Sequence, residues 1–208
     1  MSDLDTPEYW SEAYETERDN WDLEGPTPVF VELVRTFNDM FPDVDPASAS
    51  VFIPCSGRGY DAVLFAEHGF HVTAVDFSRI PLLDLEQEAV SRGLNIRIVH
   101  GDMFKLSEDH REAYDVCLEY TCYCAVDPMR RDELIGVYWN VLKPGGVFIG
   151  LMFPIDPRPG GPPFHVDADE FQDKMQERFM PLRSSTPTFS IKPRAGKEIL
   201  SIWRKPVE

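Results

Sequence analysis

The sequence predicts an α/β fold in which helices cover both faces of a mostly parallel sheet, and two observations carry this prediction. Short runs rich in β-branched and aromatic residues alternate with longer stretches of helical character, which is typical of strands and helices alternating around a parallel sheet. The first of these runs passes through Gly57 and Gly59 directly into a helical stretch, as doubly wound folds do. We therefore expect strand and helix to alternate through most of the chain.

Strands and helices are expected in regular succession in the middle of the chain. The strands are predicted at residues 51–53, 71–76, 95–100, 114–120 and 147–153. Helical character is found at residues 60–68, 79–92 and 128–142. Turns are marked by Gly69, by Gly93 and by the string Pro144-Gly145-Gly146, because glycine and proline punctuate regular structure.

The two ends of the chain differ from this middle part. An aromatic-rich lead covers residues 7–38, and its Thr27-Pro28 pair suits the N-cap and first turn of a helix. Beyond the fifth strand, residues 160–163 predict an irregular loop and residues 167–179 a helix. The runs 183–191 and 197–204 predict a closing hairpin.

Length and composition favour one globular domain over residues 1–208. The chain has 208 residues, 43% of them hydrophobic and 27% charged, and a domain typically takes about 150 residues. The net charge of −16 offers no basic surface for nucleic acid or anionic lipid. No apolar run approaches the ~20 residues of a membrane span and no secretory signal is visible, so we expect a cytoplasmic protein.

The four cysteines favour buried thiols over a disulfide scaffold or a metal site. Cys117, Cys122 and Cys124 lie in one apolar stretch and Cys55 lies apart from them. Cys122 and Cys124 have no second paired cluster at the spacing that zinc sites use. No metal is therefore predicted.

The turn after the first strand is the first candidate site. Gly57 and Gly59 let the backbone approach a ligand, and the following helix N-terminus offers unpaired N–H groups. Gly57, Gly59 and Ala62 also satisfy the dinucleotide fingerprint G-x-G-x-x-G/A, a pattern that can arise by chance. A nicotinamide-dependent oxidoreductase therefore stays open as an alternative.

Two acidic residues at strand ends extend this site. Asp76 ends the second predicted strand, where a carboxylate can accept both hydroxyl protons of a ribose. Its alternative role is that of a helix N-cap, although Ser78 already suits that task. Asp102 ends the third strand, where an acid suits an adenine amino group; its alternative is a solvated turn aspartate.

With these features the chain resembles the class I S-adenosylmethionine-dependent methyltransferases. Its string L-K-P-G-G at residues 142–146 resembles the turn that precedes the fifth strand in that class. More narrowly it resembles the thiopurine methyltransferase superfamily, closest to halide, thiocyanate and thiol methyltransferases. Four strings carry the resemblance: Y-W-S-E-A-Y-E-T-E-R-D-N-W-D-L, L-E-Y-T-C-Y-C-A-V-D-P, G-G-P-P-F-H-V-D and G-K-E-I-L-S-I-W-R-K.

The resemblance implies a Rossmann-like fold with a mostly parallel seven-stranded sheet, an antiparallel last strand and helices on both faces. It divides the chain into an aromatic lid (residues 1–40), a cofactor-binding core (51–154) and an acceptor loop with closing hairpin (155–208). The cofactor is S-adenosyl-L-methionine, which leaves as S-adenosyl-L-homocysteine. The partner is a small-molecule acceptor, bound by a monomer or weak homodimer.

The resemblance also assigns roles to residues by position. The residues implied in cofactor binding are Trp10, Tyr14, Trp21, Cys55, Gly57, Asp76, Ser78, Asp102, Met103 and Glu119. Glu119 and Tyr120 are placed at the methyl group or the methionine amine, and Phe164 at the acceptor. Three residues depart from the pattern: Cys55 replaces a frequent glycine, Tyr14 a tryptophan, and Phe164 a tyrosine whose hydroxyl is thereby lost.

The implied reaction is in-line displacement at the sulfonium methyl, for which the protein supplies position and a dry pocket. A halide, thiocyanate or bisulfide ion needs no general base; Glu119 and His165 are the nearest candidates if the acceptor must lose a proton. Arg18 and Arg158 could attract an anion, or form solvated pairs with neighbouring acids. Another S-methyltransferase acceptor, such as a thiopurine, and a cofactor-binding module without activity stay open as alternatives.

Overall fold

The computed structural model describes residues 3–207 and divides the chain into two compact units, Met1–Leu106 and Ser107–Glu208. The single domain expected for the chain stays a prediction.

The first unit contains a parallel sheet of three strands. They are β1 (Ser50–Pro54), β2 (His71–Asp76) and β3 (Ile96–His100), in the order β3-β2-β1. Both pairs run parallel, and both faces of β1 and β2 are largely buried, which explains their near-continuous apolar sequence. The three strands predicted for this part of the chain are confirmed.

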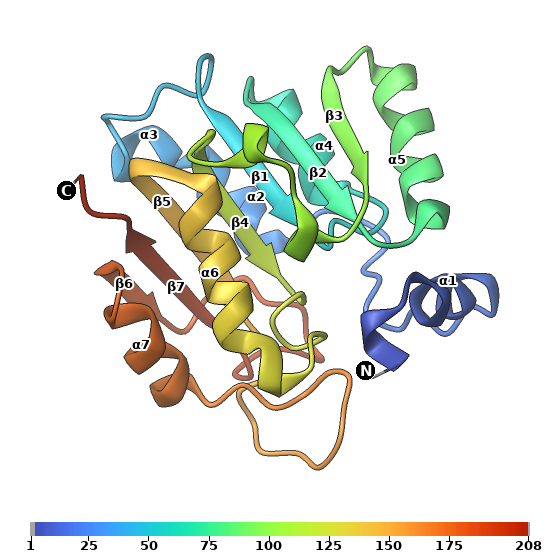
Figure 1. Ribbon diagram of the computed structural model, residues 1–208. Helices are drawn as coiled ribbons and strands as arrows, with labels where there is room; N and C mark the ends of the chain where they lie inside the picture. The colour runs from blue at the N-terminus through green and yellow to red at the C-terminus, as the bar shows by residue number, and fades with distance from the viewer. Residues whose placement is uncertain (1–2, 208) are drawn as a thin grey trace. The chain divides into compact units, whose positions relative to one another are not determined.

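Five α-helices belong to the first unit: α1 (Pro7–Glu15), α2 (Pro28–Arg35), α3 (Phe37–Met40), α4 (Tyr60–Glu67) and α5 (Arg79–Arg92). Two 3₁₀ turns, η1 (Asp3–Asp5) and η2 (Met103–Lys105), complete it. Figure 1 shows α5 running alongside β3, with α1 beside the start of α5. The turn predicted at Gly93 is confirmed, because this residue ends α5 in the left-handed conformation at φ 66°.

The predicted start of α2 is confirmed, but Thr27 works differently from an ordinary cap. Its side chain makes no hydrogen bond to the helix. Instead, Thr27 Oγ1 donates to Asp61 Oδ2 at 2.8 Å, and Thr27 N donates to Asp61 Oδ1 at 2.8 Å. The first turn of α4 is thereby tied to the start of α2.

The second unit contains four strands, β4 (Tyr114–Tyr120), β5 (Leu142–Met152), β6 (Met180–Ser185) and β7 (Ile199–Arg204). β4 and β5 pair in parallel, whereas β7 runs antiparallel to both β5 and β6. The predicted antiparallel last strand is therefore confirmed, as are the predicted number of strands and their mostly parallel pairing.

Helices α6 (Arg131–Val141) and α7 (Ala168–Gln176) accompany these strands, with the 3₁₀ turns η3 (Glu108–His110) and η4 (Pro128–Arg130). In Figure 1, α6 lies along β4 and β5, and α7 lies beside β6. The helix predicted at residues 128–142 starts as the turn η4, and that predicted at 167–179 has Asp167 as its N-cap.

Two boundaries in the second unit differ from the prediction. The string 142–146 is part of β5: Leu142 pairs with Tyr114 and Val147 with Val116, so residues 143–146 form a bulge opposite Asp115. The predicted closing hairpin is confirmed by the antiparallel pair of β6 and β7, but its first strand covers Met180–Ser185 and not residues 183–191. Pro187 has no N–H to continue the ladder, and β6 tolerates Pro181 because it pairs only with β7 among the described strands.

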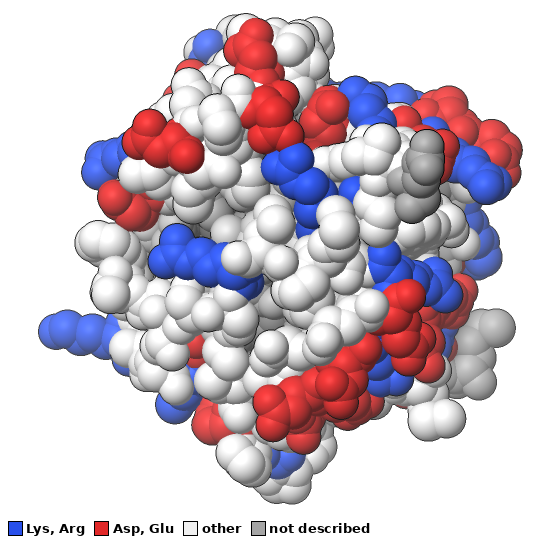
Figure 2. Space-filling view, turned by 90° about the vertical axis from the view of Figure 1, so that its left-hand side faces the viewer, with Lys and Arg blue, Asp and Glu red and all other residues white. Residues whose placement is uncertain are grey.

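Figure 2 shows acidic and basic side chains interspersed among uncharged atoms on one face of the molecule, without a broad basic patch among the residues drawn. This distribution agrees with the net charge of −16. Among residues 3–207, no helix is both long and apolar enough to cross a membrane.

Candidate methyltransferase site

The turn between β1 and α4 depends on its two glycines. Gly57 and Gly59 have φ angles of 54° and 71°, in the left-handed region that favours glycine. A Cβ on Gly59 would lie 2.5 Å from Leu85 Cδ1, and a Cβ on Gly57 would lie 3.1 Å from the Tyr14 hydroxyl oxygen. Gly59 thus allows close packing of α5, and Gly57 allows the aromatic lead to approach the turn.

Asp76 ties the end of β2 to this turn. Its Oδ2 accepts a hydrogen bond from Gly57 N at 2.8 Å, and its Oδ1 accepts one from Ser78 N at 2.9 Å. Burial raises the pKa of Asp76 against the lowering effect of these donors. Each carboxylate oxygen has a second lone pair, so the geometry leaves acceptor capacity for a ribose hydroxyl.

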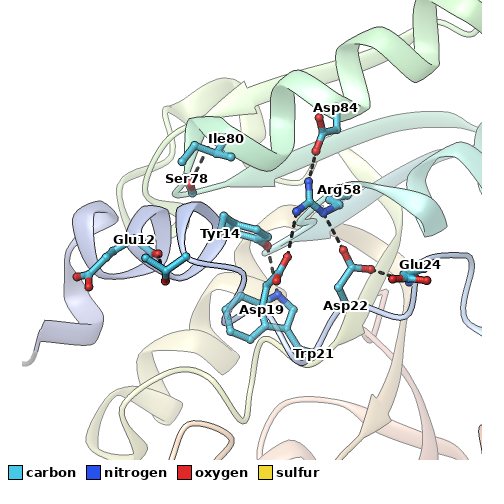
Figure 3. Close-up of polar contacts among 11 residues, drawn as sticks. Glu12, Tyr14, Asp19, Trp21, Asp22, Glu24, Arg58, Ser78, Ile80 and Asp84 are labelled. Carbon is cyan, nitrogen blue, oxygen red and sulfur yellow. Dashed lines mark hydrogen bonds and ion pairs between the residues drawn. The ribbon is translucent and has the colours of Figure 1, made fainter.

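Ser78 takes the capping task that was the alternative for Asp76. It is the N-cap of α5, and its Oγ accepts a hydrogen bond from Ile80 N at 3.3 Å (Figure 3). The same Oγ lies 3.0 Å from Ser11 Oγ of α1. A contact from this buried side chain to cofactor stays a prediction.

Asp102 and Met103 follow β3 as predicted. Asp102 Oδ1 accepts from Phe104 N at 2.9 Å, which makes Asp102 the N-cap of η2, and its Oδ2 lies 3.0 Å from Lys105 Nζ. Met103 is buried, and its sulfur lies 3.9 Å from Cys55 Sγ. Asp102 thus has the turn role that was its alternative, and its Oδ2 pairs with the exposed side chain of Lys105.

The expectation of four buried thiols was wrong for two cysteines. Cys117 and Cys124 are free and buried, as expected. Cys55 is disulfide-bonded, and so is Cys122. Cys55 and Cys122 lie far apart in the sequence. The close spacing of the cysteines in the apolar stretch therefore did not indicate that either residue forms a disulfide.

The aromatic residues of the lead form one cluster. Trp21 Nε1 donates to the Tyr14 hydroxyl at 3.2 Å, and the Trp21 ring meets Tyr14 and Trp10 edge-on at 5.5 and 5.6 Å between centroids. Trp10 Nε1 donates to Leu4 O at 3.0 Å. Tyr14 is buried, whereas Trp10 and Trp21 are half-buried, so the cluster combines core packing with partial exposure.

Sequence reasoning missed Arg58, which lies between the two glycines of the turn. Its guanidinium binds Asp22 through Nε at 2.7 Å and Asp19 through Nη2 at 3.0 Å, and it also pairs with Asp84 of α5 (Figure 3). An arginine inside a glycine turn, together with a lead rich in acidic residues, was the available signal.

In the second unit, Glu119 is buried near the end of β4. Its Oε1 accepts from Tyr123 N at 3.0 Å and its Oε2 from the Tyr138 hydroxyl at 3.3 Å. Burial raises the pKa of Glu119 to about 7, despite these donors and the nearby Arg131. A carboxyl group of this kind can exchange a proton near neutral pH.

Tyr120 is the centre of a second polar cluster that sequence reasoning found only in part. Its hydroxyl donates to Glu198 Oε1 at 2.6 Å and accepts from Arg194 Nη1. The Arg194 guanidinium also lies over the rings of Tyr120 and Phe153, 5.1 and 4.7 Å from their centroids. Burial raises the pKa of Tyr120, so this hydroxyl stays protonated at neutral pH.

Phe164 and His165 lie in the loop after β5. Phe164 N donates to Cys124 O at 2.7 Å, and its ring lies against Gly161, where a Cβ would come within 2.4 Å of Phe164 Cδ1. His165 O accepts from Arg131 Nη2 at 2.9 Å, while its buried Nδ1 has no hydrogen-bond partner among the described residues. His165 is thus held by its backbone, with one ring nitrogen available.

The two arginines considered for anion attraction form local pairs. Arg18 binds Glu12 at 2.9 Å, with both side chains more than half exposed. Arg158 binds Asp156 at 2.8 Å and lies 5.6 Å from the Phe153 ring centroid. Arg18 therefore forms the solvated pair that was its alternative, whereas Arg158 lies near the same aromatic ring as Arg194.

The arrangement of strands and helices is shared with solved methyltransferase structures. The chain is similar to a Burkholderia thailandensis 1,6-didemethyltoxoflavin-N1-methyltransferase solved with bound S-adenosylhomocysteine, with a TM-score of 0.74 and 20% identity over 96% of this chain and 87% of that one. The predicted Rossmann-like methyltransferase fold is therefore confirmed. The sequence match to a methyltransferase family over residues 5–201 identifies the chain as an S-adenosylmethionine-dependent methyltransferase.

The family follows from the sequence comparison. Residues 5–201 match the model of the family "Thiopurine S-methyltransferase (TPMT)", and the chain belongs to this family. It is 33% identical to "Probable thiol methyltransferase 2" of Arabidopsis thaliana, over 94% of this chain and 84% of that protein. It is 29% identical to "Thiocyanate methyltransferase 1" of the same plant, with the same coverage.

Proposed function

We propose that this enzyme methylates a small sulfur nucleophile or a halide, with thiocyanate, bisulfide and iodide as the acceptors to test first. Two similar proteins carry the names of a thiol and a thiocyanate methyltransferase, which supports a small acceptor. Bound S-adenosylmethionine supplies an activated methyl group. Transfer of this methyl to the acceptor's lone pair would break the sulfonium–carbon bond, leave its electrons on sulfur and release S-adenosylhomocysteine.

Residues of the first unit fit the cofactor. The two left-handed glycines present backbone without side chains, and the Asp76 carboxylate keeps acceptor capacity for a ribose. We propose that Gly57 and Cys55 line the amino-acid end of the cofactor and that Asp102 and Met103 contact its adenine. Tyr14, Trp10 and Trp21 would then exclude water above it, as lid residues do.

The observation that carries the acceptor proposal is the cluster of Tyr120, Arg194 and Glu198. The Arg194 guanidinium lies over two aromatic rings, beside the Tyr120–Glu198 pair, and we propose that this cation–π arrangement contacts a large, polarisable anion. The Tyr120 hydroxyl is protonated and already donates to Glu198, so it does not act as a base. These properties favour an acceptor that arrives as an anion and needs no proton removed.

Glu119 and His165 provide the route by which a protonated acceptor could be used. Glu119 has a pKa raised to about 7, and His165 Nδ1 is unpartnered among the described residues. A thiol or a thiopurine would require such a base at neutral pH, or would react through its own anion. This is the observation that keeps a larger S-methyltransferase acceptor as the second candidate.

Headspace gas analysis tests the proposal. The protein is incubated with S-adenosylmethionine and, separately, iodide, bromide, bisulfide and thiocyanate, and methylated gases are measured together with S-adenosylhomocysteine. We expect methyl iodide and methyl thiocyanate, with one S-adenosylhomocysteine per product. Binding of S-adenosylhomocysteine with no methylated product from any acceptor, a thiopurine included, would instead support a binding module without activity. A cytoplasmic location and a monomeric or weakly dimeric state remain proposals, tested by fractionation and sedimentation.

A further inference from the structure

Arg58 joins three segments of the first unit through its side chain. Its guanidinium contacts Asp19 and Asp22, which lie between α1 and α2, and Asp84 on α5. Figure 3 shows the three carboxylates converging on this one guanidinium from different elements. The guanidinium uses Nε, Nη1 and Nη2 for different partners, so its donors are divided between the lead and α5.

The two contacts to the lead are better shielded from water than the contact to α5. The side chains of Asp19 and Asp22 are 16% and 14% exposed, whereas that of Asp84 is 47% exposed. Arg58 itself is 27% exposed. Ion pairs that are partly withdrawn from water are screened less than exposed ones. The pairs with Asp19 and Asp22 therefore stabilise the position of Arg58 more than the pair with Asp84 does.

Arg58 also contacts the aromatic cluster. Its guanidinium carbon lies 5.4 Å from the centroid of the Tyr14 ring, within the range of a cation–π contact. The Tyr14 hydroxyl accepts from Trp21 and approaches Gly57, the residue before Arg58. Polar and aromatic contacts therefore join the same two segments, the lead and the glycine turn.

The charges make this junction dependent on one residue. Three carboxylates surround a single guanidinium, so without Arg58 only repulsion would remain among them. Among residues 3–207, no group of three His, Cys, Asp or Glu side chains is arranged to hold a metal ion. The hydrogen bonds to the three carboxylates raise the pKa of Arg58 although burial opposes this effect, and the side chain keeps its charge.

We propose that Arg58 is a positioning residue that fastens residues 14–22 of the aromatic lead to the glycine turn, so that lid closure over cofactor depends on this ion-pair cluster. The proposal rests on the proposed function in one respect, namely that the glycine turn holds the cofactor. The fastening itself is a property of the free protein and can be measured without any ligand.

The first experiment measures hydrogen exchange of residues 14–26 in the free protein. The variants are Arg58→Met, Arg58→Lys and, as matched control, Arg92→Met. Arg92 lines the same pocket as Arg58 and pairs with Glu67 of α4 and Glu88 of α5, which both lie outside the lead. We expect faster exchange in Arg58→Met and no change in Arg92→Met. Arg58→Lys should have a smaller effect than Arg58→Met, because lysine keeps the positive charge but its ammonium group lacks the planar set of donors of a guanidinium.

Salt gives a readout that a loss of packing alone would not produce. Raising NaCl from about 0.05 M to about 1 M shortens the Debye length from above 10 Å to about 3 Å. In the unaltered protein this weakens attraction to Arg58, so exchange of the lead should accelerate. In Arg58→Met it weakens repulsion among the carboxylates, so exchange should slow. Equal exchange in the unaltered protein and Arg58→Met, or the same salt direction in both, would overturn the proposal, as would an equal effect of Arg92→Met.

Calorimetric titration with S-adenosylhomocysteine separates this proposal from the proposed function. We expect Arg58→Met to weaken binding about tenfold, an effect equivalent to the loss of one charged hydrogen bond, with partial recovery at high salt. If the unaltered protein does not bind this ligand, the proposed function fails while the exchange result still decides the role of Arg58. If Arg58→Met does not fold, Asp22→Asn replaces it: faster lead exchange supports the fastening, and unchanged exchange refutes it.

Discussion

Asp61, Asp76 and Glu119 are buried carboxyl groups in which burial outweighs the surrounding hydrogen-bond donors. Burial raises the pKa of Asp61 to about 6 and that of Glu119 to about 7, and it raises the pKa of Asp76 as well. Each group nevertheless accepts two hydrogen bonds. Their hydrogen bonds stabilise the local structure, and their raised pKa values make the free energy of unfolding depend on pH near neutrality.

Glu119→Gln should remove part of that pH dependence. Because the native state binds the Glu119 proton more tightly than the unfolded chain, the free energy of unfolding falls as pH rises from the group's usual 4.5 to about 7. A shift of this size corresponds to about 3 kcal/mol. Urea denaturation at pH 5 and pH 8 should show a smaller difference in Glu119→Gln than in the unaltered protein. The exposed control Glu108→Gln should keep the full difference; a full difference in Glu119→Gln would contradict the burial argument.

Asp76→Asn tests the ribose contact. The substitution keeps the shape of the side chain but removes its charge, and its amide nitrogen cannot accept from either Gly57 N or Ser78 N. Loss of a charge-assisted contact worth about 1.5–3 kcal/mol should weaken S-adenosylhomocysteine binding by about 10- to 100-fold. Calorimetric titration measures this change, and thermal unfolding of the free variant checks its fold. Equal affinities would remove Asp76 from the cofactor site.

The residues that could be predicted from the sequence are those at strand ends and in glycine turns. The predicted strand ends and the predicted turn are occupied by Asp76, Asp102 and Gly57. These points can be located because strands show a regular alternation of residue types and because glycine and proline mark turns. Arg58 and Arg194 could not be predicted in this way. Their partners lie far away in the sequence, at Asp84 for Arg58 and at Tyr120 for Arg194, and only the folded chain brings such pairs together.

At the scale of elements, local pattern located the buried strands well and the edge strand poorly. β1, β2, β4 and the apolar part of β5 are buried on both faces and form continuous apolar runs. β6 is almost entirely exposed, so its sequence lacks this signal, and its limits depend on pairing with β7. The bulge in β5 depends likewise on a tertiary contact, since Lys143 pairs with Asp115 at 2.8 Å.

The segment formed by α1 and the following residues up to α2 should become more protected when cofactor product binds. Trp10 and Trp21 remain half-buried, and the segment is held by side-chain contacts rather than by strand pairing, which is typical of regions that open locally. We expect saturating S-adenosylhomocysteine to slow hydrogen exchange across residues 7–30. The strand β7, which is already buried, provides an internal control with little change. Unchanged exchange at residues 7–30 would show that these aromatics are ordinary core.

At the scale of the whole molecule, the net charge of −16 repels an anionic acceptor over long distances. An anionic acceptor must then be attracted locally, and we propose that Arg194, which is buried beside the Phe153 ring, contributes to this attraction. The balance between the two effects is sensitive to salt. Binding of the proposed anionic acceptor consequently depends on the charges of the local cluster and not on the electrostatic field of the whole protein.

The pH dependence of turnover discriminates between acceptors that arrive as anions and acceptors that must lose a proton. Iodide and thiocyanate stay anionic throughout the accessible range, so their saturated turnover should be nearly flat from about pH 6 to pH 9 when no protein base takes part. Turnover of a thiol should rise with pH and level off near the pKa of the thiol itself. A base such as Glu119, whose pKa is about 7, would instead impose its own titration on the thiol profile, and Glu119→Gln would remove it. We expect the flat profile for iodide, with Glu119→Gln weakening cofactor binding more than turnover. If no methyl iodide or methyl thiocyanate forms at any pH while a thiol or heterocycle is methylated, the proposed halide and thiocyanate acceptors are wrong. The larger sulfur acceptors would then be the favoured substrates.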